Sequence, residues 1–359
     1  MSTRMSGVAG NARHASNVPD LPPTWRLIEC DTVPDGEQVL GAVCFAGFAP
    51  ERPERPDGAP FCIVPLTALD TRLPAIVWYG RGPTAGETHD ALAYRTDGET
   101  LFGVLRDDRC EPGQVQMATF EAYETLLRAA RELGYPEVYR LWNYLPRIND
   151  ETEGLEVYKA FSIGRRRAFD RHAPIAGGGV MPAACAIGTD APRGLAVCFL
   201  ARRDVVSAVS NPRQIEAFDY PPIYGPTSPA FSRGVVVRRH RSAVMHLSGT
   251  ASIVGHATRH LGDIDRQIDE TIANLDALLQ TVGSRLANIA DGALLTVYLR
   301  HATDYPAARR RLSEVLKPNV KTLYLRGDIC RRSLLVEIEG IIELPDSPRA
   351  LLMDRGGRK

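Results

Sequence analysis

The order of strand-like and helix-like segments occurs twice along this chain of 359 residues. In the first half, apolar residues recur at helical spacing over 120–133 and stop at Gly134, where a C-terminal cap is expected. A strand "EVYRLWNYL", a second helix "LEVYKAFSIGRRRAF" and the strands "ACAIGTD" and "GLAVCFLA" follow. The second half repeats this order with an apolar stripe over 264–282, "GALLTVYLR", "YPAARRRLSEVL", "KTLYLRG" and "LLVEIEGI". The long period predicts duplication of a whole α+β domain rather than a solenoid.

The two copies differ at one position that matters for chemistry. Laying their last strands together aligns Gly188 with Gly327 and places Cys198 where the second copy has Glu337. Only the second copy therefore keeps an acid on this strand. The proline-rich stretch "NPRQIEAFDYPPIYGP" is the natural join between the copies. We predict a flexible leader over 1–22, a degenerate first domain over 23–210, a catalytic second domain over 211–346 and a flexible tail over 347–359.

Composition excludes several classes of partner. Lys+Arg and Asp+Glu both number 43, so no global field favours nucleic acid or an anionic membrane. The seven cysteines show no metal-ligand spacing, and we interpret them as mostly free thiols in a reducing compartment. The chain shows no long uncharged apolar run, and its beginning lacks the apolar core of a signal peptide. These features predict a cytoplasmic protein without a metal site.

Glu337 is the strongest candidate for an acid. It lies within the apolar strand "LLVEIEG", where its neighbours predict burial on both faces. A buried carboxylate without a partner responds with a raised pKa, which is the property of a general acid near neutral pH. Glu339 shares its face of the strand but lies nearer the end, so it is the weaker candidate.

Several arginines are candidates for binding a small dianion, because a planar guanidinium binds a carboxylate through two hydrogen bonds. Three of them are consecutive on the second predicted helix, so at most two can face one pocket. Arg165 is the first choice because it follows Gly164 directly. The candidates are Arg165, Arg166, Arg167, Arg233, Arg331 and Arg332.

Loop and turn residues supply the remaining candidates. The backbone amides of Gly249 and Thr250 in "HLSGTASIVGH" are placed to hold an oxyanion, and prolines around Tyr224 favour its presentation into a cleft. His256 and His260 have a metal-binding spacing for a helix, but the surrounding glycines indicate a loop. Cys330 is read as a small buried residue whose pKa the following arginine would lower.

These motifs now carry a resemblance. The segments from Tyr224 to Arg233, "SGTA", "VYLRHATDY" and "VEIEG" resemble the YjgF/RidA superfamily of trimeric α+β enamine deaminases. A longer ordered set, "RLWNYLPRIN", "GLEVYKAFSIGRRRAF", "YGPTSPAFSRG", "SGTASIVGH" and "DICRRSLLVEIEG", is similar to the chorismatase family. The resemblance implies an α+β fold of two tandem YjgF/RidA-like (chorismate-mutase-like) domains, each a mixed sheet with helices packed on one face.

The resemblance also implies a reaction. Its substrate would be chorismate, a dianion with an enolpyruvyl ether, whose methylene Glu337 would protonate to release pyruvate without a cofactor. A cysteine at position 330 resembles the branch that forms 3-hydroxybenzoate, with 4-hydroxybenzoate as a second product, so Cys330 would influence which product forms. The implied catalytic residues are Glu337 and Cys330, and the implied substrate-binding residues are Tyr158, Arg165, Tyr224, Arg233, Gly249, Thr250 and Arg331.

Three other functions stay open at this point. A chorismate hydrolase would add water and release a dihydroxycyclohexadiene carboxylate with pyruvate. An enamine or imine deaminase would explain only the last third of the chain, and Thr227 stands where such enzymes usually place tyrosine. A non-enzymatic small-ligand-binding protein would not need an acid in one copy alone. A monomer and a homotrimer are both compatible with a tandem pair.

Overall fold

A computed structural model describes residues 25–30, 36–47, 59–89, 91–172, 180–238, 242–289 and 292–344. The predicted leader over 1–22 and tail over 347–359 lie outside these ranges. The helices are α1 (Val115–Glu132), α2 (Val157–His172), α3 (Ile264–Gln280) and α4 (Tyr305–Val315). All four match predicted helices, and Gly134 and Gly283 take the left-handed conformation expected after a helix end.

The strands form three larger sheets. The first sheet contains β6 (Ala85–His89), β7 (Leu92–Thr96), β8 (Thr100–Asp107), β9 (Glu137–Pro146), β12 (Ala183–Thr189), β13 (Leu195–Arg202) and β21 (Asp328–Ile329). The second contains β4 (Thr67–Ala68), β14 (Ser207–Val209), β15 (Gly234–Arg238), β16 (Ala243–Ala251), β19 (Leu294–Leu299), β20 (Lys321–Arg326) and β22 (Val336–Leu344). The third contains β1 (Trp25–Glu29), β2 (Val39–Phe45), β3 (Phe61–Val64) and β5 (Pro74–Tyr79).

Short elements complete the chain. Two small hairpins pair β10 (Glu151–Thr152) with β11 (Leu155–Glu156), and β17 (Ile253–Val254) with β18 (Ala257–Thr258). The 3-10 turns are η2 (Pro112–Gln114), η4 (Ala217–Asp219), η5 (Pro222–Tyr224), η6 (Leu286–Asn288) and η7 (Ala302–Asp304).

The strand order confirms the duplication. The first sheet contains the run β7-β8-β13-β9-β12 and the second the run β15-β16-β22-β19-β20, each with its elements in the same chain order. The same pair is parallel in both copies, β9 with β12 and β19 with β20, and the other pairs are antiparallel. The expected fold class, α+β with two tandem mixed sheets, is confirmed.

The two copies also exchange short strands. β21 comes from the second half but pairs with β12 of the first sheet, and β4 comes from the first half but pairs with β20. β14 precedes the predicted boundary at 210, yet it pairs with β15 in the second sheet. The division at 210 and 211 stays a prediction, since the chain crosses between sheets on both sides of it.

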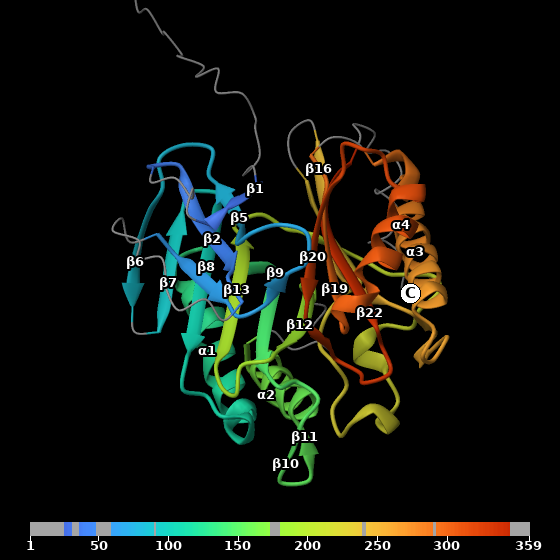
Figure 1. Cartoon of the computed structure of the whole chain (residues 1–359). Coiled ribbons are helices and arrows are strands. Elements are labelled where there is room, and N and C mark those ends of the chain that lie inside the picture. The colour runs from blue at the N-terminus through green and yellow to red at the C-terminus, as the bar shows by residue number, and fades with distance from the viewer. Residues whose placement is uncertain are drawn as a thin grey trace, which may run out of the picture.

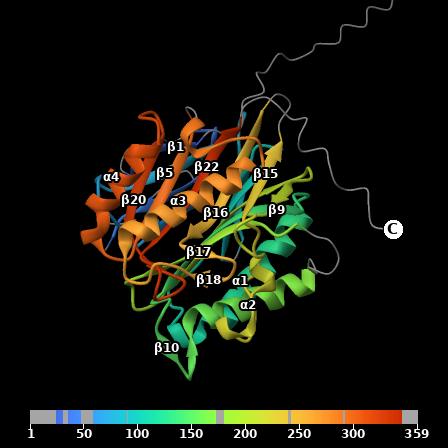
Figure 2. The ribbon, with the colours of Figure 1, turned by 90° about the vertical axis from the view of Figure 1, so that its right-hand side faces the viewer.

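Each sheet has helices on one face, and the opposite faces meet (Figure 1). α1 and α2 pack on the first sheet in one apolar cluster, and α3 and α4 pack on the second in another. Figure 2 shows α3 lying across its own sheet, away from α1 and α2. The third sheet closes the space between the other two, since Trp78 of β5 joins Trp142 of β9 and Tyr298 of β19 in one shared core. The inner faces are therefore buried, and polar groups on them need partners.

The cysteines are mostly free, as predicted, with one exception. Cys62, Cys110, Cys185, Cys198 and Cys330 are free, whereas Cys30 and Cys44 form a disulfide with Cα atoms 5.8 Å apart. Cys30 directly follows β1 and Cys44 lies on β2, so the third sheet brings the two thiols together. Their spacing in the sequence does not reveal this contact.

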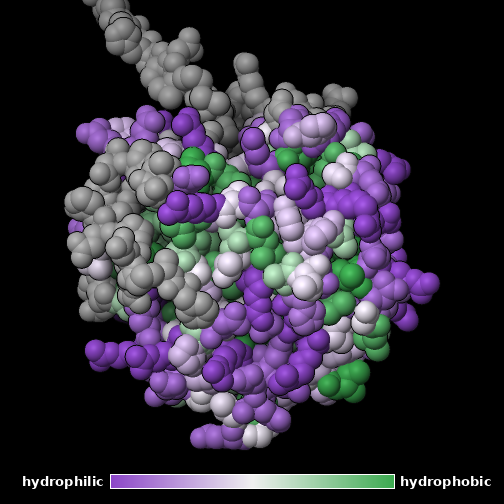
Figure 3. All heavy atoms as spheres, viewed as in Figure 1, coloured by the Kyte–Doolittle hydropathy of each residue, from purple (hydrophilic) through white to green (hydrophobic). Residues whose placement is uncertain are grey.

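The surface agrees with the balanced composition. On the face seen in Figure 3, apolar residues lie in separate groups among polar ones. Among the described residues no helix is long and apolar enough to cross a membrane.

Candidate active site

A cavity of about 370 Å³ lies between the first two sheets. Its walls come from α2, from β12 of the first sheet, from β16 and β22 of the second, and from the segments that precede β15 and β22. The volume suits a small organic ligand. Of the predicted site residues, the cavity is lined by Tyr158, Arg165, Tyr224, Arg233, Gly249, Cys330, Arg331 and Glu337.

Glu337 is the buried acidic residue that lines this cavity. It lies on the inner face of β22 opposite Tyr298 of β19, and it is only 4% exposed. Its carboxyl makes no hydrogen bond or ion pair with any other described residue. Burial raises the pKa of Glu337 from 4.5 to about 8, and the charge of Arg140 opposes this rise. The group is therefore largely protonated at neutral pH and able to donate a proton.

Gly249 leaves the space that Glu337 occupies. The ladder between β16 and β22 shifts register between Leu247 and Thr250, so Gly249 lies in an irregularity of the strand. A Cβ atom added at Gly249 would come 1.9 Å from Oε1 of Glu337. Glycine is thus required here by the close approach of the acid.

Gly249→Ala should therefore displace the Glu337 carboxyl and reduce turnover by about tenfold or more, because a shift of about an ångström at a reacting group is enough for such a loss. The free energy of unfolding should fall by about 1–3 kcal/mol from overpacking. Turnover and urea unfolding check both effects. Gly113→Ala is the control, since a Cβ at Gly113 meets nothing within 4 Å. Wild-type turnover in Gly249→Ala would contradict this account.

Thr250 is the one residue of the predicted set that is not among those lining the cavity. Its hydroxyl donates to the Ser248 carbonyl oxygen at 3.0 Å, and Thr250 pairs with Ile338, which packs against the helices. The predicted role of the Gly249 and Thr250 backbone amides stays a prediction. Ser248 instead links the two sheets, accepting from the Ala184 amide at 2.9 Å and donating to the Ser232 carbonyl.

Three arginines at the cavity have buried N–H groups without a partner among the described residues. These are Nε and Nη2 of Arg165, Nε of Arg233 and Nη2 of Arg331. Arg165 is 1% exposed and lies over the ring of Phe161 at 4.7 Å. Unpaired buried cations are costly, so this set predicts an anionic ligand that supplies the missing acceptors.

The three arginines differ in how many of their groups are already used. Arg233 donates to the Ile215 carbonyl and to the Tyr220 hydroxyl at 3.0 Å, and Arg331 donates to the His256 carbonyl at 2.8 Å. Of the consecutive arginines only Arg165 lines the cavity, because Arg166 pairs with Asp170 on the surface.

Two tyrosines complete the walls. Tyr224 lies under the guanidinium of Arg331 at 3.9 Å and its hydroxyl is hydrogen-bonded to Nδ1 of His256 at 3.1 Å. Burial raises the pKa of Tyr158, so this side chain is a neutral hydroxyl beside the cavity. His256 lies in the turn between β17 and β18, as the glycines predicted, and His260 pairs with Glu270. Within the described ranges, no group of three or more His, Cys, Asp or Glu residues is arranged to hold a metal ion.

Burial raises the pKa of the Cys330 thiol to about 12, and the charge of Glu337 also raises it. Arg331 lowers this pKa, as the sequence predicts, but this effect does not decide the outcome. Because the thiol is removed from water, one neighbouring cation does not offset the cost of a thiolate. Cys330 is therefore a protonated, weakly polar thiol in the wall.

Residues outside the predicted set hold the segment that carries Cys330 and Arg331. Arg300 donates to the backbone oxygens of Leu334, Ile329 and Arg331 at 2.8, 3.0 and 3.0 Å. Gln267 of α3 donates to the Ser333 carbonyl and accepts from the Leu335 amide, both at 2.8 Å. Both residues stand in motifs that the sequence displays, but their partners are backbone groups, which no motif reveals.

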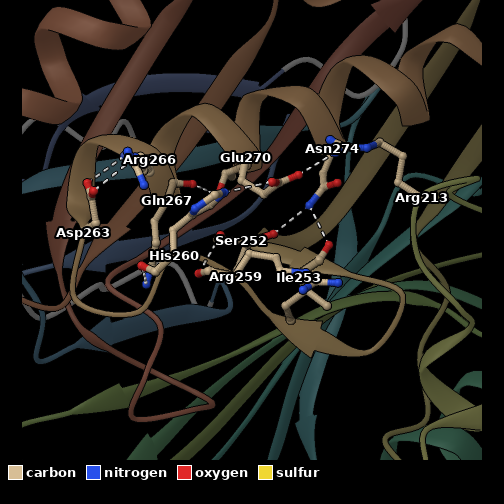
Figure 4. A network of polar contacts seen from close by, with 12 residues as sticks. Arg213, Ser252, Ile253, Arg259, His260, Asp263, Arg266, Gln267, Glu270 and Asn274 are labelled. Carbon is tan, nitrogen blue, oxygen red and sulfur yellow. Dashed lines mark hydrogen bonds and ion pairs between the residues drawn. The ribbon is translucent and has the colours of Figure 1, made fainter.

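α3 also holds the wall formed by β17. Figure 4 shows Asn274 directed at the Ile253 carbonyl oxygen, with Gln267, Glu270 and Asn274 along one side of the helix. Asn274 donates to the carbonyls of Ala251 and Ile253 at 3.0 and 2.8 Å, and both of those residues line the cavity. The polar face of α3 thus fixes one side of the site.

Comparison with known proteins agrees with this architecture. The family described as "Chorismatase FkbO/Hyg5-like, N-terminal" matches residues 77–201. A protein of Streptomyces hygroscopicus named 3-hydroxybenzoate synthase is 34% identical over 322 residues, which cover 86% of this chain and 93% of that protein. The chain belongs to the chorismatase family. A second relative from S. hygroscopicus, named chorismatase, is 34% identical over 80% of this chain and 84% of its own.

A solved chorismatase structure extends this agreement to three dimensions. It superposes on the present chorismatase with a TM-score of 0.80 at 32% identity, covering 89% of this chain and 98% of the other. The shared fold thus extends over both copies of the duplicated domain.

Proposed function

We propose that this chorismatase converts chorismate to 3-hydroxybenzoate and pyruvate. The observation that carries the proposal is Glu337, a buried carboxyl with a pKa of about 8 that has no hydrogen bond or ion pair within the described part of the chain, in the wall of a cavity lined by Arg165. A protonated acid is what cleavage of an enolpyruvyl ether requires. The relatives named 3-hydroxybenzoate synthase and chorismatase support the same substrate.

The chemistry follows from these groups. Glu337 gives its proton to the methylene carbon of the enolpyruvyl group, which leaves an oxocarbenium ion at the ether carbon. The Arg165, Arg233 and Arg331 guanidinium groups receive the two carboxylates of the substrate. The bond between ring carbon 3 and the ether oxygen then breaks, and pyruvate leaves with that oxygen. The 4-hydroxyl oxygen bonds to carbon 3 in its place, its bond to carbon 4 breaks, and loss of the hydrogen on carbon 3 as a proton makes the ring aromatic and returns the proton that Glu337 gave. Hydroxybenzoate and pyruvate together have the composition of chorismate, so no water is consumed.

Incubation of the purified protein with chorismate, followed by chromatography of the products, tests the proposal. We expect equal amounts of 3-hydroxybenzoate and pyruvate, with any 4-hydroxybenzoate as a minor product. Persistence of chorismate would exclude the proposal, and a dihydroxycyclohexadiene carboxylate would assign the hydrolytic reaction instead. A cytoplasmic location and the choice between monomer and homotrimer stay predictions.

Cys330→Ala should change the product ratio more than the rate. The thiol of Cys330 is protonated and lines the cavity with Glu337, so we assign it to the control of the ring after the ether breaks. We expect the diol fraction to rise severalfold while pyruvate release falls by about tenfold or less, since this neutral contact contributes only about 0.5–1.5 kcal/mol. The measurement is the ratio of diol to hydroxybenzoate at equal conversion. Cys62→Ala, which removes a buried thiol in the third sheet, is the control. An unchanged ratio would remove Cys330 from this step.

A further inference from the structure

A buried ion pair lies next to Glu337. Glu339 is two residues further along β22, on the same face as Glu337, and it is 2% exposed. It forms an ion pair with Arg140 of β9, which is 1% exposed. Arg140 of the first sheet thus places its positive charge beside β22, the strand that carries Glu337.

The surroundings of Glu339 are those of an ionised carboxylate. Besides Arg140, the indole of Trp142 donates to its Oε1 at 3.1 Å and the hydroxyl of Tyr298 donates to the same atom at 2.9 Å. Three donors around one carboxylate favour its charged form. Glu339 therefore cannot serve as a second proton donor, although its position in the sequence resembles that of Glu337.

Arg140 acts on both carboxylates. Burial raises the pKa of Glu337, and the positive charge of Arg140 lowers it. Burial lowers the pKa of Arg140, and the charge of Glu337 is one of several that oppose this shift. Nε and Nη1 of Arg140 have no partner among the described residues, so Glu339 is its one ionic partner there. A second carboxylate within reach of this cation would ionise if Glu339 did not already hold it.

We infer that Glu339 and Arg140 are positioning residues that act through Glu337: by neutralising Arg140, Glu339 leaves Glu337 protonated and able to act as the acid. The inference rests on the proposed function, in which Glu337 is the proton donor. Glu337 and Glu339 thus lie two residues apart with opposite protonation states. Glu337 lines the cavity, whereas Glu339 is surrounded by three donors.

Other groups near Glu337 do not replace this control. Burial raises the pKa of Tyr158 from α2, Cys185 from β12, Tyr298 from β19 and Cys330 from the segment before β22, so all four are uncharged at neutral pH. The charged residues that line the cavity are Glu156, Lys159, Arg165, Arg233, Arg331 and Arg332. Their charges are present in every variant below, so they cancel in a comparison of variants.

The test is the pH dependence of kcat/KM for pyruvate release, which reports the free enzyme. The wild-type rate should fall above pH 8, as Glu337 loses its proton. Glu339→Gln removes the anion that pairs with Arg140, so the pKa of Glu337 falls. The decline of kcat/KM at alkaline pH, the alkaline limb, should then begin at least about one pH unit lower than in wild type. At pH values above 8 the kcat/KM of this variant should be about tenfold lower than that of wild type, and near pH 6 the two should differ little.

A double variant supplies the decisive comparison. Arg140→Met combined with Glu339→Gln removes both charges, so the alkaline limb should return close to its wild-type position. Replacing a buried ion pair by neutral groups is often tolerated, so the double variant can still be measured if Glu339→Gln does not fold. Glu343→Gln, on the same face of β22 but exposed, is the matched control and should not move the limb.

Two outcomes would overturn the inference. One is a Glu339→Gln profile that is lowered equally at every pH, which is the result of a structural role alone. The other is a double variant whose limb stays shifted. Failure of the proposed function looks different, because Glu337→Gln would then keep the wild-type profile whatever happens at Glu339.

Discussion

Glu337→Gln should reduce pyruvate release from chorismate by about a thousandfold, within the range for loss of a general acid. Glutamine keeps the shape of the side chain but carries no transferable proton at neutral pH. Because Glu337 has no hydrogen-bond or ionic partner among the residues that the structure describes, the substitution leaves the surrounding hydrogen bonds intact, and the loss should fall on kcat with little change in KM. Single-turnover release of pyruvate measures the effect. A rate within threefold of wild type would exclude Glu337 as the proton donor.

The same variant has a second readout that does not depend on substrate. In the folded protein burial raises the pKa of Glu337 from its ordinary 4.5 to about 8, so wild-type stability is lost as pH rises between these values. Glu337→Gln lacks this loss. Its free energy of unfolding should exceed that of wild type by roughly 2–5 kcal/mol above pH 8, and the difference should shrink towards pH 4.5. Urea unfolding at several pH values measures it.

Arg165→Met should raise the KM for chorismate by about tenfold to a hundredfold. Hydrogen bonds to charged groups contribute about 1.5–3 kcal/mol each, and Arg165 offers two buried N–H groups that have no partner in the described ranges. Methionine keeps much of the side-chain volume without the charge. Steady-state kinetics separates KM from kcat, and Arg165→Lys should be nearly as impaired, because lysine cannot bind a carboxylate through two parallel hydrogen bonds.

Arg166→Met is the matched control, since it follows directly on α2 but pairs with Asp170 at 2.9 Å on the surface. It should leave KM within about twofold, as exposed ion pairs contribute little. Arg165→Met should also unfold at no lower urea concentration than wild type, since it removes a buried unpaired cation. An unchanged KM in that variant would remove Arg165 from substrate binding.

Local patterns were sufficient for the elements of the fold. The apolar stripe over 264–282 predicted α3, because apolar residues at helical spacing lie on one face of the helix and that face becomes buried. The repeated order of such elements predicted the duplication for the same reason. The third sheet and the exchange of β4 and β21 were not predictable, because short strands pair with whatever edge the packed sheets leave open.

The candidate site also has features that the sequence could predict and features that it could not. Chemistry that depends on residue type and burial, such as the raised pKa of Glu337 and the anion-binding arginines, was open to sequence reasoning. Sequence reasoning did not show that an irregularity of β16 brings Gly249 against Glu337, or that burial of Cys330 outweighs the charge of Arg331. Both depend on the balance of competing effects in three dimensions.

The sequence by itself determined the helices, the main strands, the duplication and the presence of one acid in the second copy, because periodicity and burial are local properties. The sequence ranked Glu337 above Glu339 as the candidate acid, and only the tertiary structure decided how differently the two are surrounded. Trp142 and Glu339 are 197 positions apart, yet the Trp142 indole and Arg140 both contact the Glu339 carboxylate, whereas Glu337 has no hydrogen bond or ion pair among the described residues. Protonation depends on the distances between charges and donors, and these arise only when the two sheets pack face to face.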